Sequence, residues 1–187
     1  SLSPNGKWAV LTPDGVFATA TKNTGPLTVV DLADEGRRLA VADCHSFAFS
    51  PDGNTLAVLS RDASRVRTWS LTALTNPPAV LKRPKRAIAF HDGSASFPIS
   101  SIPGIACTPR GDMAALWADY ECAVLSAEGK EVTYGFGPKL KTCAFPKDGH
   151  HVWASYGDEG WIWINLKTGR CRRQLIADTY QAGIRLG

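Results

Sequence analysis

Short apolar runs separated by polar turns recur along this chain. The stretch FAFSPDGNTLAV at 47–58 places one apolar run, a turn and a second apolar run side by side in the sequence. Pro51 favours the first corner of a turn, Asp52 can hydrogen-bond to its own backbone, and Gly53 tolerates a positive φ. Because β-favouring residues flank this turn, the stretch predicts a hairpin.

The same turn is repeated elsewhere. Three comparable stretches, WAVLTPDGVFATA, GIACTPRGDMAAL and TCAFPKDGHHVWA, reach their turn glycine at Gly15, Gly111 and Gly149. With Gly53 second in the series, successive turn glycines are 38, 58 and 38 residues apart. The spacing therefore indicates one repeated unit with about twenty residues inserted once.

Further strands follow each turn. A second apolar stretch, LTVVDL, VRTWSL, CAVLSA or WIWINL, lies 15 to 17 residues after the turn glycine. A fourth short strand fits the remainder of each unit, as in RRLAVA at 37–42 or CRRQLI at 171–176. A period near 40 residues with four strands per unit is typical of a β-propeller blade.

These repeats resemble the WD40 family. The matching residues are FAFSPDG, RVRTWSL and the stretch WIWINLKTGRC, in which a Thr-Gly turn follows the third strand, and the resemblance covers roughly residues 8–180. It implies an all-β fold, a β-propeller with about four blades of four antiparallel strands. The expected blades are 8–43, 44–81, 102–138 and 139–180. The expected insertion is 82–104.

The sequence departs from the family pattern in two motifs. No unit has the Gly-His pair before the first strand, and the Trp-Asp dipeptide is kept only in part, as Trp69-Ser70 and Val30-Asp31. Counterparts of the family's structural aspartate before the third strand are Asp62, Asp119 and Asp158. The resemblance therefore implies a divergent member that keeps the strand pattern.

Length, composition and charge narrow the class of protein. A chain of 187 residues with 44% apolar composition can bury one sizeable core or several stacked small sheets. No apolar run approaches the roughly 18 residues that span a bilayer, so we expect no membrane segment. The start of the chain lacks the pattern of a secretory signal, which favours a cytoplasmic or nuclear setting. A net charge of +4 suits acidic partners and falls short of a dedicated nucleic-acid-binding domain.

The five cysteines largely follow the repeat. Cys107, Cys122 and Cys143 align with apolar columns, where a cysteine behaves as a small buried hydrophobe. Cys44 and Cys171 fall outside these columns, so either could be an exposed thiol. Among the six tryptophans, four lie in expected strands and are predicted to pack between blades: Trp8, Trp69, Trp153 and Trp161.

No catalytic constellation emerges from the motifs. Cys44 and His45 are neighbours in an extended segment and face apart, as do His150 and His151 after Cys143. The glycines mark turns rather than a phosphate-binding loop, and the prominent aspartates have turn or capping roles. We therefore expect no enzyme activity, no cofactor and no metal. A propeller associated with a peptidase or hydrolase remains the alternative from another class.

One face of the expected propeller collects its irregular loops. The loops between second and third strands and those between blades emerge on the same face, and loops of extra length often carry function. The long connection at 81–104 belongs to this face, although an alternative alignment makes 87–93 a first strand and leaves 94–104 as the insertion. The expected partner-binding residues are Arg61, Arg65, Lys82, Arg83, Lys85, Arg86, Tyr120, Tyr156 and Glu159.

These loops suggest a function in protein interaction. The basic side chains could bind a protein or peptide that is acidic or phosphorylated, and the aromatic and acidic ones could add contacts. A nucleic-acid-contacting propeller is a further alternative, and it predicts binding that weakens steeply with salt.

Four units leave two architectures open. The chain could form a small four-bladed ring, or a segment of a larger propeller whose other blades lie beyond these ends or on another chain. Its start in mid-pattern favours the segment. An open propeller exposes blade faces and unpaired strand edges, which promotes association.

Overall fold

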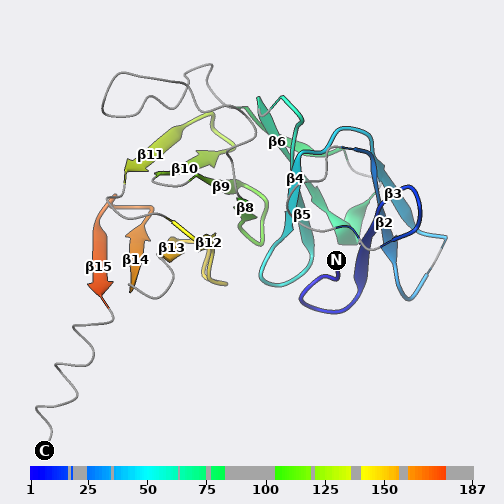
Figure 1. Cartoon of the computed structure of the whole chain (residues 1–187), viewed down its shortest axis with the longest axis horizontal. Helices are drawn as coiled ribbons and strands as arrows, with labels where there is room; N and C mark the ends of the chain where they lie inside the picture. The colour runs from blue at the N-terminus through cyan, green and yellow to red at the C-terminus, as the bar shows by residue number, and fades with distance from the viewer. Residues whose placement is uncertain are drawn as a thin grey trace, which may run out of the picture.

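The structure of the chain, a computed structural model, is all-β over the residues it describes. These are 1–16, 18, 25–34, 36–62, 64–74, 77–82, 104–118, 121–135, 140–155 and 160–175. They form four antiparallel sheets that follow one another in chain order, with the first and the fourth sheet at opposite ends (Figure 1). This confirms the all-β part of the expected fold class, with antiparallel sheets of three or four strands each. Within these ranges no helix has the length and apolar character needed to cross a membrane.

Each sheet is a meander of consecutive strands. The first sheet contains β1 (Trp8–Leu11), β2 (Leu27–Asp31) and β3 (Arg38–Val41). The second contains β4 (Ser46–Phe49), β5 (Thr55–Leu59), β6 (Arg65–Ser70) and β7 (Ala79–Lys82), with a short 3-10 helix at Leu71–Ala73. The third contains β8 (Gly104–Cys107), β9 (Met113–Ala118), β10 (Glu121–Ser126) and β11 (Glu131–Gly135). The fourth contains β12 (Thr142–Ala144), β13 (His151–Ser155), β14 (Gly160–Asn165) and β15 (Cys171–Leu175).

The predicted hairpin at 47–58 is present. Strands β4 and β5 pair across the turn, and the Gly53 N–H donates to the Ser50 carbonyl at 2.9 Å. Gly53, Gly111 and Gly149 have φ values of 73°, 69° and 65°, which is the left-handed region that glycine adopts without steric cost. The turn residues therefore have the geometric role that the sequence predicts for them.

One hydrogen bond recurs in all four sheets and fixes the register of the repeat. In each sheet the backbone N–H of the residue directly after one strand, β2, β6, β10 or β14, donates a hydrogen bond. The acceptor is the carbonyl of the residue that follows the turn glycine. The four bonds, at 2.8 to 3.0 Å, are Leu32 to Lys7, Leu71 to Asn54, Ala127 to Asp112 and Leu166 to His150. In the first sheet the acceptor is Lys7, so the turn glycine of that unit is Gly6.

The prediction that Gly15 marks the first unit is therefore wrong. Strand β1 pairs directly with β2, while its other edge meets the start of the chain through the Leu2–Ala9 bridge. Gly15 instead lies in a second turn within the β1–β2 connection, where its N–H donates to the Thr12 carbonyl at 3.0 Å. Both TPDG and SPNG suit a turn, and only strand pairing decides between them.

The core is divided among the boundaries between sheets. Alternate side chains of each strand face the preceding or the following sheet, as the period of a strand requires. Each pair of consecutive sheets shares one cluster of buried apolar residues, and the first strands β4, β8 and β12 lie next to one another. At the boundary of the second and third sheets, Ala57, Leu59 and Leu116 are at most 1% exposed.

The turn of the third sheet is hydrogen-bonded to the second sheet. A Cβ added at Gly111 would lie 3.0 Å from Thr68 Oγ1, so this turn of the third sheet touches the second sheet directly. The Thr55 hydroxyl donates to the Pro109 carbonyl at 2.6 Å, and the Thr68 hydroxyl donates to the Gly111 carbonyl at 2.8 Å. These bonds satisfy polar groups at an otherwise apolar boundary.

The cysteine predictions hold for the three apolar columns. Cys107, Cys122 and Cys143 are buried, and of the remaining pair only Cys171 is exposed. Cys44 is 1% exposed, and burial raises the pKa of its thiol to about 12. Burial likewise raises the pKa of Cys107 to about 12. These buried thiols are therefore poor nucleophiles at neutral pH.

The tryptophan prediction is wrong for Trp153 and Trp161. Trp8 and Trp69 are buried between the first and second sheets, whereas Trp161 is half-buried and stacks on Trp153. Trp153, in contrast, has 43% of its surface exposed. It lies on the fourth sheet and points away from the third, where no sheet of the described chain covers it.

Candidate functional site

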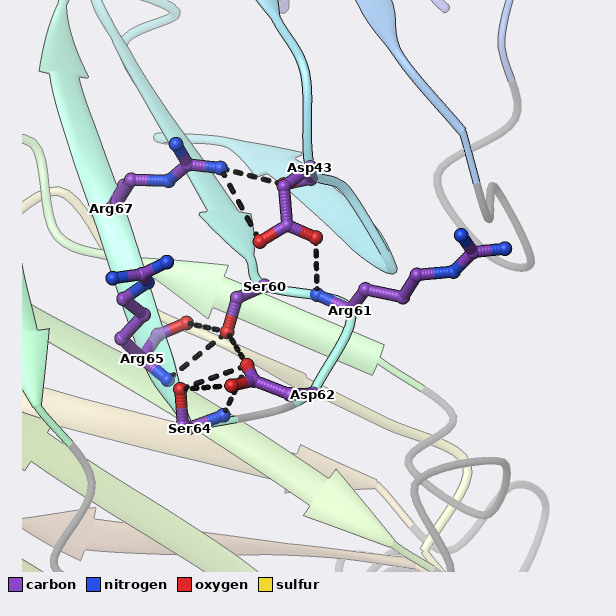
Figure 2. A network of polar contacts seen from close by, with 7 residues as sticks. All are labelled: Asp43, Ser60, Arg61, Asp62, Ser64, Arg65 and Arg67. Atoms are coloured by element: carbon purple, nitrogen blue, oxygen red, sulfur yellow. Dashed lines mark hydrogen bonds and ion pairs between the residues drawn. The ribbon is translucent and has the colours of Figure 1, made fainter.

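The β5–β6 loop and the junction between the first and second sheets meet at one corner of the molecule. The Arg61 N–H donates to Asp43 Oδ1 at 2.9 Å, which ties the loop to the junction (Figure 2). The two kinds of loop expected on one face of a propeller are thus neighbours here. Their backbones are held together before any partner binds.

Asp62 organises the interior of this loop. Its carboxylate accepts a hydrogen bond from the Ser60 hydroxyl at 2.6 Å, and bonds from the Ser64 N–H at 3.1 Å and the Ser64 hydroxyl at 2.8 Å (Figure 2). The bond from Ser60, followed by those from Ser64, lowers the pKa of Asp62 to about 2. Asp62 therefore remains ionised under ordinary conditions and serves the loop rather than a ligand.

Arg67 is a member of the site that the sequence analysis missed. It lies on β6, and its guanidinium donates to the Asp43 carbonyl at 2.7 Å and lies 4.0 Å from Asp43 Oδ2. The same group lies 5.3 Å from the centre of the Trp69 ring. Residues two apart on a strand share a face, so the Arg-x-Trp spacing could have indicated this cation–π contact.

Arg61 and Arg65 lie on the exposed side of this loop. Both side chains are exposed, and the Arg61 guanidinium points away from the network in Figure 2. The Arg65 backbone is fixed, because its N–H donates to the Ser60 hydroxyl at 3.2 Å. The loop, with Arg61, and the start of β6, with Arg65, thus present two guanidinium groups to solvent from a constrained backbone.

The remaining predicted site residues are placed only in part. Lys82 ends β7, where its backbone pairs with that of Arg65, so these two basic residues are cross-strand neighbours. Six further predicted residues lie outside the described part of the chain: Arg83, Lys85, Arg86, Tyr120, Tyr156 and Glu159. Most of the 82–104 insertion also lies outside it, and the two alignments of that segment remain open.

Within the described ranges, no group of three or more histidine, cysteine, aspartate or glutamate side chains could hold a metal ion. Three hollows of the described surface lie away from the loop: one of about 340 Å³ beside β10 and β11, and one on the outer face of each of the first and fourth sheets.

Comparison with known proteins supports the fold. No protein-family model matches the chain, and no curated protein matches it. Hydrazine synthase of Kuenenia stuttgartiensis is similar over 94% of this chain and 47% of its own, with 17% identity and a TM-score of 0.53. The dihydro-heme d1 dehydrogenase NirN, solved in complex with DHE, is similar over 94% of this chain and 35% of its own, with 19% identity and a TM-score of 0.50.

These similarities concern architecture alone. Both neighbours are propeller-type proteins, so the four antiparallel sheets have a propeller-like arrangement. The chain spans less than half the length of each neighbour. At such identities the fold carries no information about ligand or activity.

Proposed function

We propose that this protein is a non-catalytic interaction domain, a WD40-like propeller of about four blades that acts in the cytoplasm or nucleus. It binds an acidic or phosphorylated segment of a protein partner on the face formed by the 60–64 loop, the sheet junction at Asp43 and the 82–104 insertion. The observation that carries this proposal is the pair of exposed arginine side chains, Arg61 on a loop fixed by hydrogen bonds and Arg65 at the start of β6.

The electrostatics of the corner support binding of an anion. The carboxylate of Asp43 lies near Arg67 and accepts the Arg61 N–H, while the carboxylate of Asp62 accepts bonds from serines. Both acids are thus engaged by the scaffold. Guanidinium groups bind carboxylate and phosphate through two parallel hydrogen bonds, and a preorganised loop lowers the entropy cost of binding.

A labelled peptide tests the proposal. The probe is a fluorescein-labelled peptide carrying two phosphoserines among acidic residues, and its anisotropy is followed as protein is added. Arg61→Glu with Arg65→Glu should weaken binding by about tenfold or more, because rim charges steer and hold an anionic partner. The matched control is Arg110→Glu with Lys147→Glu, which makes the same charge change on exposed turn residues at the opposite ends of the strands.

Three results would count against the proposal. The first is unchanged binding in the Arg61/Arg65 variant, and the second is an equal loss in the control variant. The third is a stronger response to a single-stranded oligonucleotide than to the peptide, with affinity that falls steeply as salt rises. That result would favour the nucleic-acid alternative.

A second candidate is the propeller part of a larger enzyme. Both structural neighbours, a hydrazine synthase and a dehydrogenase, are enzymes by name, and each is more than twice as long as its matched part. The sequence of the surrounding gene tests this candidate. A hydrolase, peptidase or oxidoreductase domain in the same reading frame would favour it over an independent interaction domain.

A further inference from the structure

The two end sheets have outer faces that no described sheet covers. Three clusters of buried residues join the first sheet to the second, the second to the third and the third to the fourth. None of these clusters joins the fourth sheet to the first. The face of the fourth sheet that points away from the third, and the face of the first sheet that points away from the second, are both at the surface.

The outer face of the fourth sheet is aromatic. Trp153 and Trp161 stack with ring centres 4.7 Å apart and planes 2° apart, and Trp163 lies 6.2 Å from Trp153. A hollow of about 360 Å³ borders the Trp163 ring and is lined by His151, Trp163, Asn165, Thr168, Arg170 and Arg172. The opposite face of the same strands, with Val152 and Ile164, is fully buried against the third sheet.

This aromatic face has the position of an interface. Counting from the turn glycine and following the strand register, His151 and Trp163 correspond to Thr55 and Thr68 of the second sheet. In the second sheet both positions donate a hydrogen bond to a carbonyl in the turn of the following sheet. In the fourth sheet the indole Nε1 of Trp163 is buried and has no hydrogen-bond partner among the described residues. A buried donor without an acceptor is costly. A sheet packed against this face could supply a carbonyl as the acceptor.

The outer face of the first sheet has no aromatic side chain among the described residues around its hollow. This hollow, of about 390 Å³, is lined by Ala9, Leu11, Thr12, Pro13, Gly15, Thr28, Val30, Leu32 and Arg38, which apart from Arg38 are small or aliphatic. Leu32 is 50% exposed and Leu2, also on this side, is 54% exposed.

The turn of the first sheet supplies the matching acceptors. The carbonyls of Pro4 and Gly6 correspond to those of Pro109 and Gly111 in the third sheet, which accept the two threonine bonds. Within the described ranges, neither the Pro4 nor the Gly6 carbonyl accepts a hydrogen bond.

We propose that a second copy of this chain binds at these faces, head to tail. The outer face of the fourth sheet, here called the tryptophan face, packs in one copy on the outer face of the first sheet of the other copy. The reciprocal contact closes the pair into one ring. The contact continues the interface already present three times within the chain, where a cluster of buried apolar side chains joins consecutive sheets. One chain carries both halves of the contact, so a second copy satisfies both at once.

Sedimentation equilibrium of the purified chain tests the proposal. We expect a dimer at micromolar concentration. Trp153→Glu and Leu32→Glu, each at an exposed position, should each raise the dissociation constant at least tenfold. The matched controls are Val80→Glu and Val132→Glu, at 43% and 49% exposure on the second and third sheets, and they should leave the mass unchanged. A monomer throughout the concentration range would overturn the proposal and leave these faces to a different sheet.

A mixing experiment distinguishes head-to-tail pairing from other pairings. Trp153→Glu and Leu32→Glu proteins in equal amounts should form a mixed dimer, because one of its two contacts joins two intact faces. A dimer that survives Leu32→Glu but not Trp153→Glu would mean that two tryptophan faces pair with each other, which contradicts the proposal. Circular dichroism checks that both variants fold, and Trp153→Ser with Leu32→Ser repeats the experiment if either glutamate variant does not.

Discussion

Two surfaces of the molecule are formed by corresponding positions of the repeated unit. One is the boundary between the second and third sheets, and the other is the outer face of the fourth sheet. In the second sheet these positions hold Ala57 and Val66, which are fully buried against the third sheet. In the fourth sheet they hold Trp153 and Trp161, which remain at least partly at the surface. The strand alternation is the same in both sheets. Burial in this molecule therefore depends on whether a further sheet covers the face.

The largest contrast should come from truncating one side chain on each surface. Leu116→Ala, at the covered boundary, should destabilise the fold by about 2 to 5 kcal/mol, because the change leaves a cavity among buried neighbours. Trp153→Ala should cost less than about 1 kcal/mol at a concentration where the chain is monomeric. Urea unfolding measures both changes. Equal losses would mean that the outer face is packed as tightly as the boundary.

Alanine substitutions at two turn glycines compare a turn that contacts another sheet with a turn that does not. Gly111 and Gly6 have φ values of 69° and 70°, so alanine at either should cost about 1 to 2 kcal/mol in backbone strain. A Cβ at Gly111 would also crowd the Thr68 side chain, whereas one at Gly6 would meet nothing within 4 Å. Gly111→Ala should therefore lower the melting temperature more than Gly6→Ala does. The reverse order would contradict the contact between the third-sheet turn and the second sheet.

Removing a threonine hydroxyl from a covered face and from an uncovered face should also have different effects on stability, by a smaller amount. Thr68→Val removes the bond to the Gly111 carbonyl at the covered boundary and should cost about 1 kcal/mol. Thr28→Val, on the outer face of the first sheet, makes the same chemical change beside a hollow and should have little effect. The free energy of unfolding in urea gives both values. A cost for Thr28→Val as large as that for Thr68→Val would show that the outer face is already occupied.

The smallest expected effect is a pH dependence at the β5–β6 loop. The folded pKa of Asp62, about 2, lies below the unfolded value of about 3.9. A lowered pKa stabilises the fold above the unfolded value, and that contribution is lost as the pH falls through the folded one. Asp62→Asn should therefore flatten the stability profile between about pH 4 and pH 2. The carboxyl carbon shift in an NMR titration reports the pKa directly, and titration near pH 4 would contradict the loop geometry.

Much of the fold followed from local sequence. The turn at Gly53 and the alternation of its flanking strands specify the hairpin without help from distant residues, and the apolar columns placed Cys107, Cys122 and Cys143 in the core. The register of the first unit did not follow, because two good turn sequences compete there and only the pairing of β1 with β2 decides. The exposure of Trp153 also depends on a distant neighbour, which no local pattern encodes.

The candidate site was less accessible to sequence reasoning. The turn pattern placed Arg61 and Arg65 in a loop, which holds for Arg61, whereas Arg65 begins β6 and pairs with the backbone of Lys82. The contacts of Asp43 with Arg61 and Arg67 join segments 18 and 24 residues apart, so they required the tertiary arrangement.

Residue-resolved hydrogen exchange tests the central claim, that four copies of one unit follow one another from the first turn glycine at Gly6. The amides that mark the unit are those of Leu32, Leu71, Ala127 and Leu166. The account predicts that all four exchange slowly and that the Leu32 amide loses its protection in the Gly6→Ala variant before the other three. A Leu32 amide that exchanges as fast as an exposed loop, while the other three stay protected, would contradict the register of the first sheet and with it the series of four equivalent sheets.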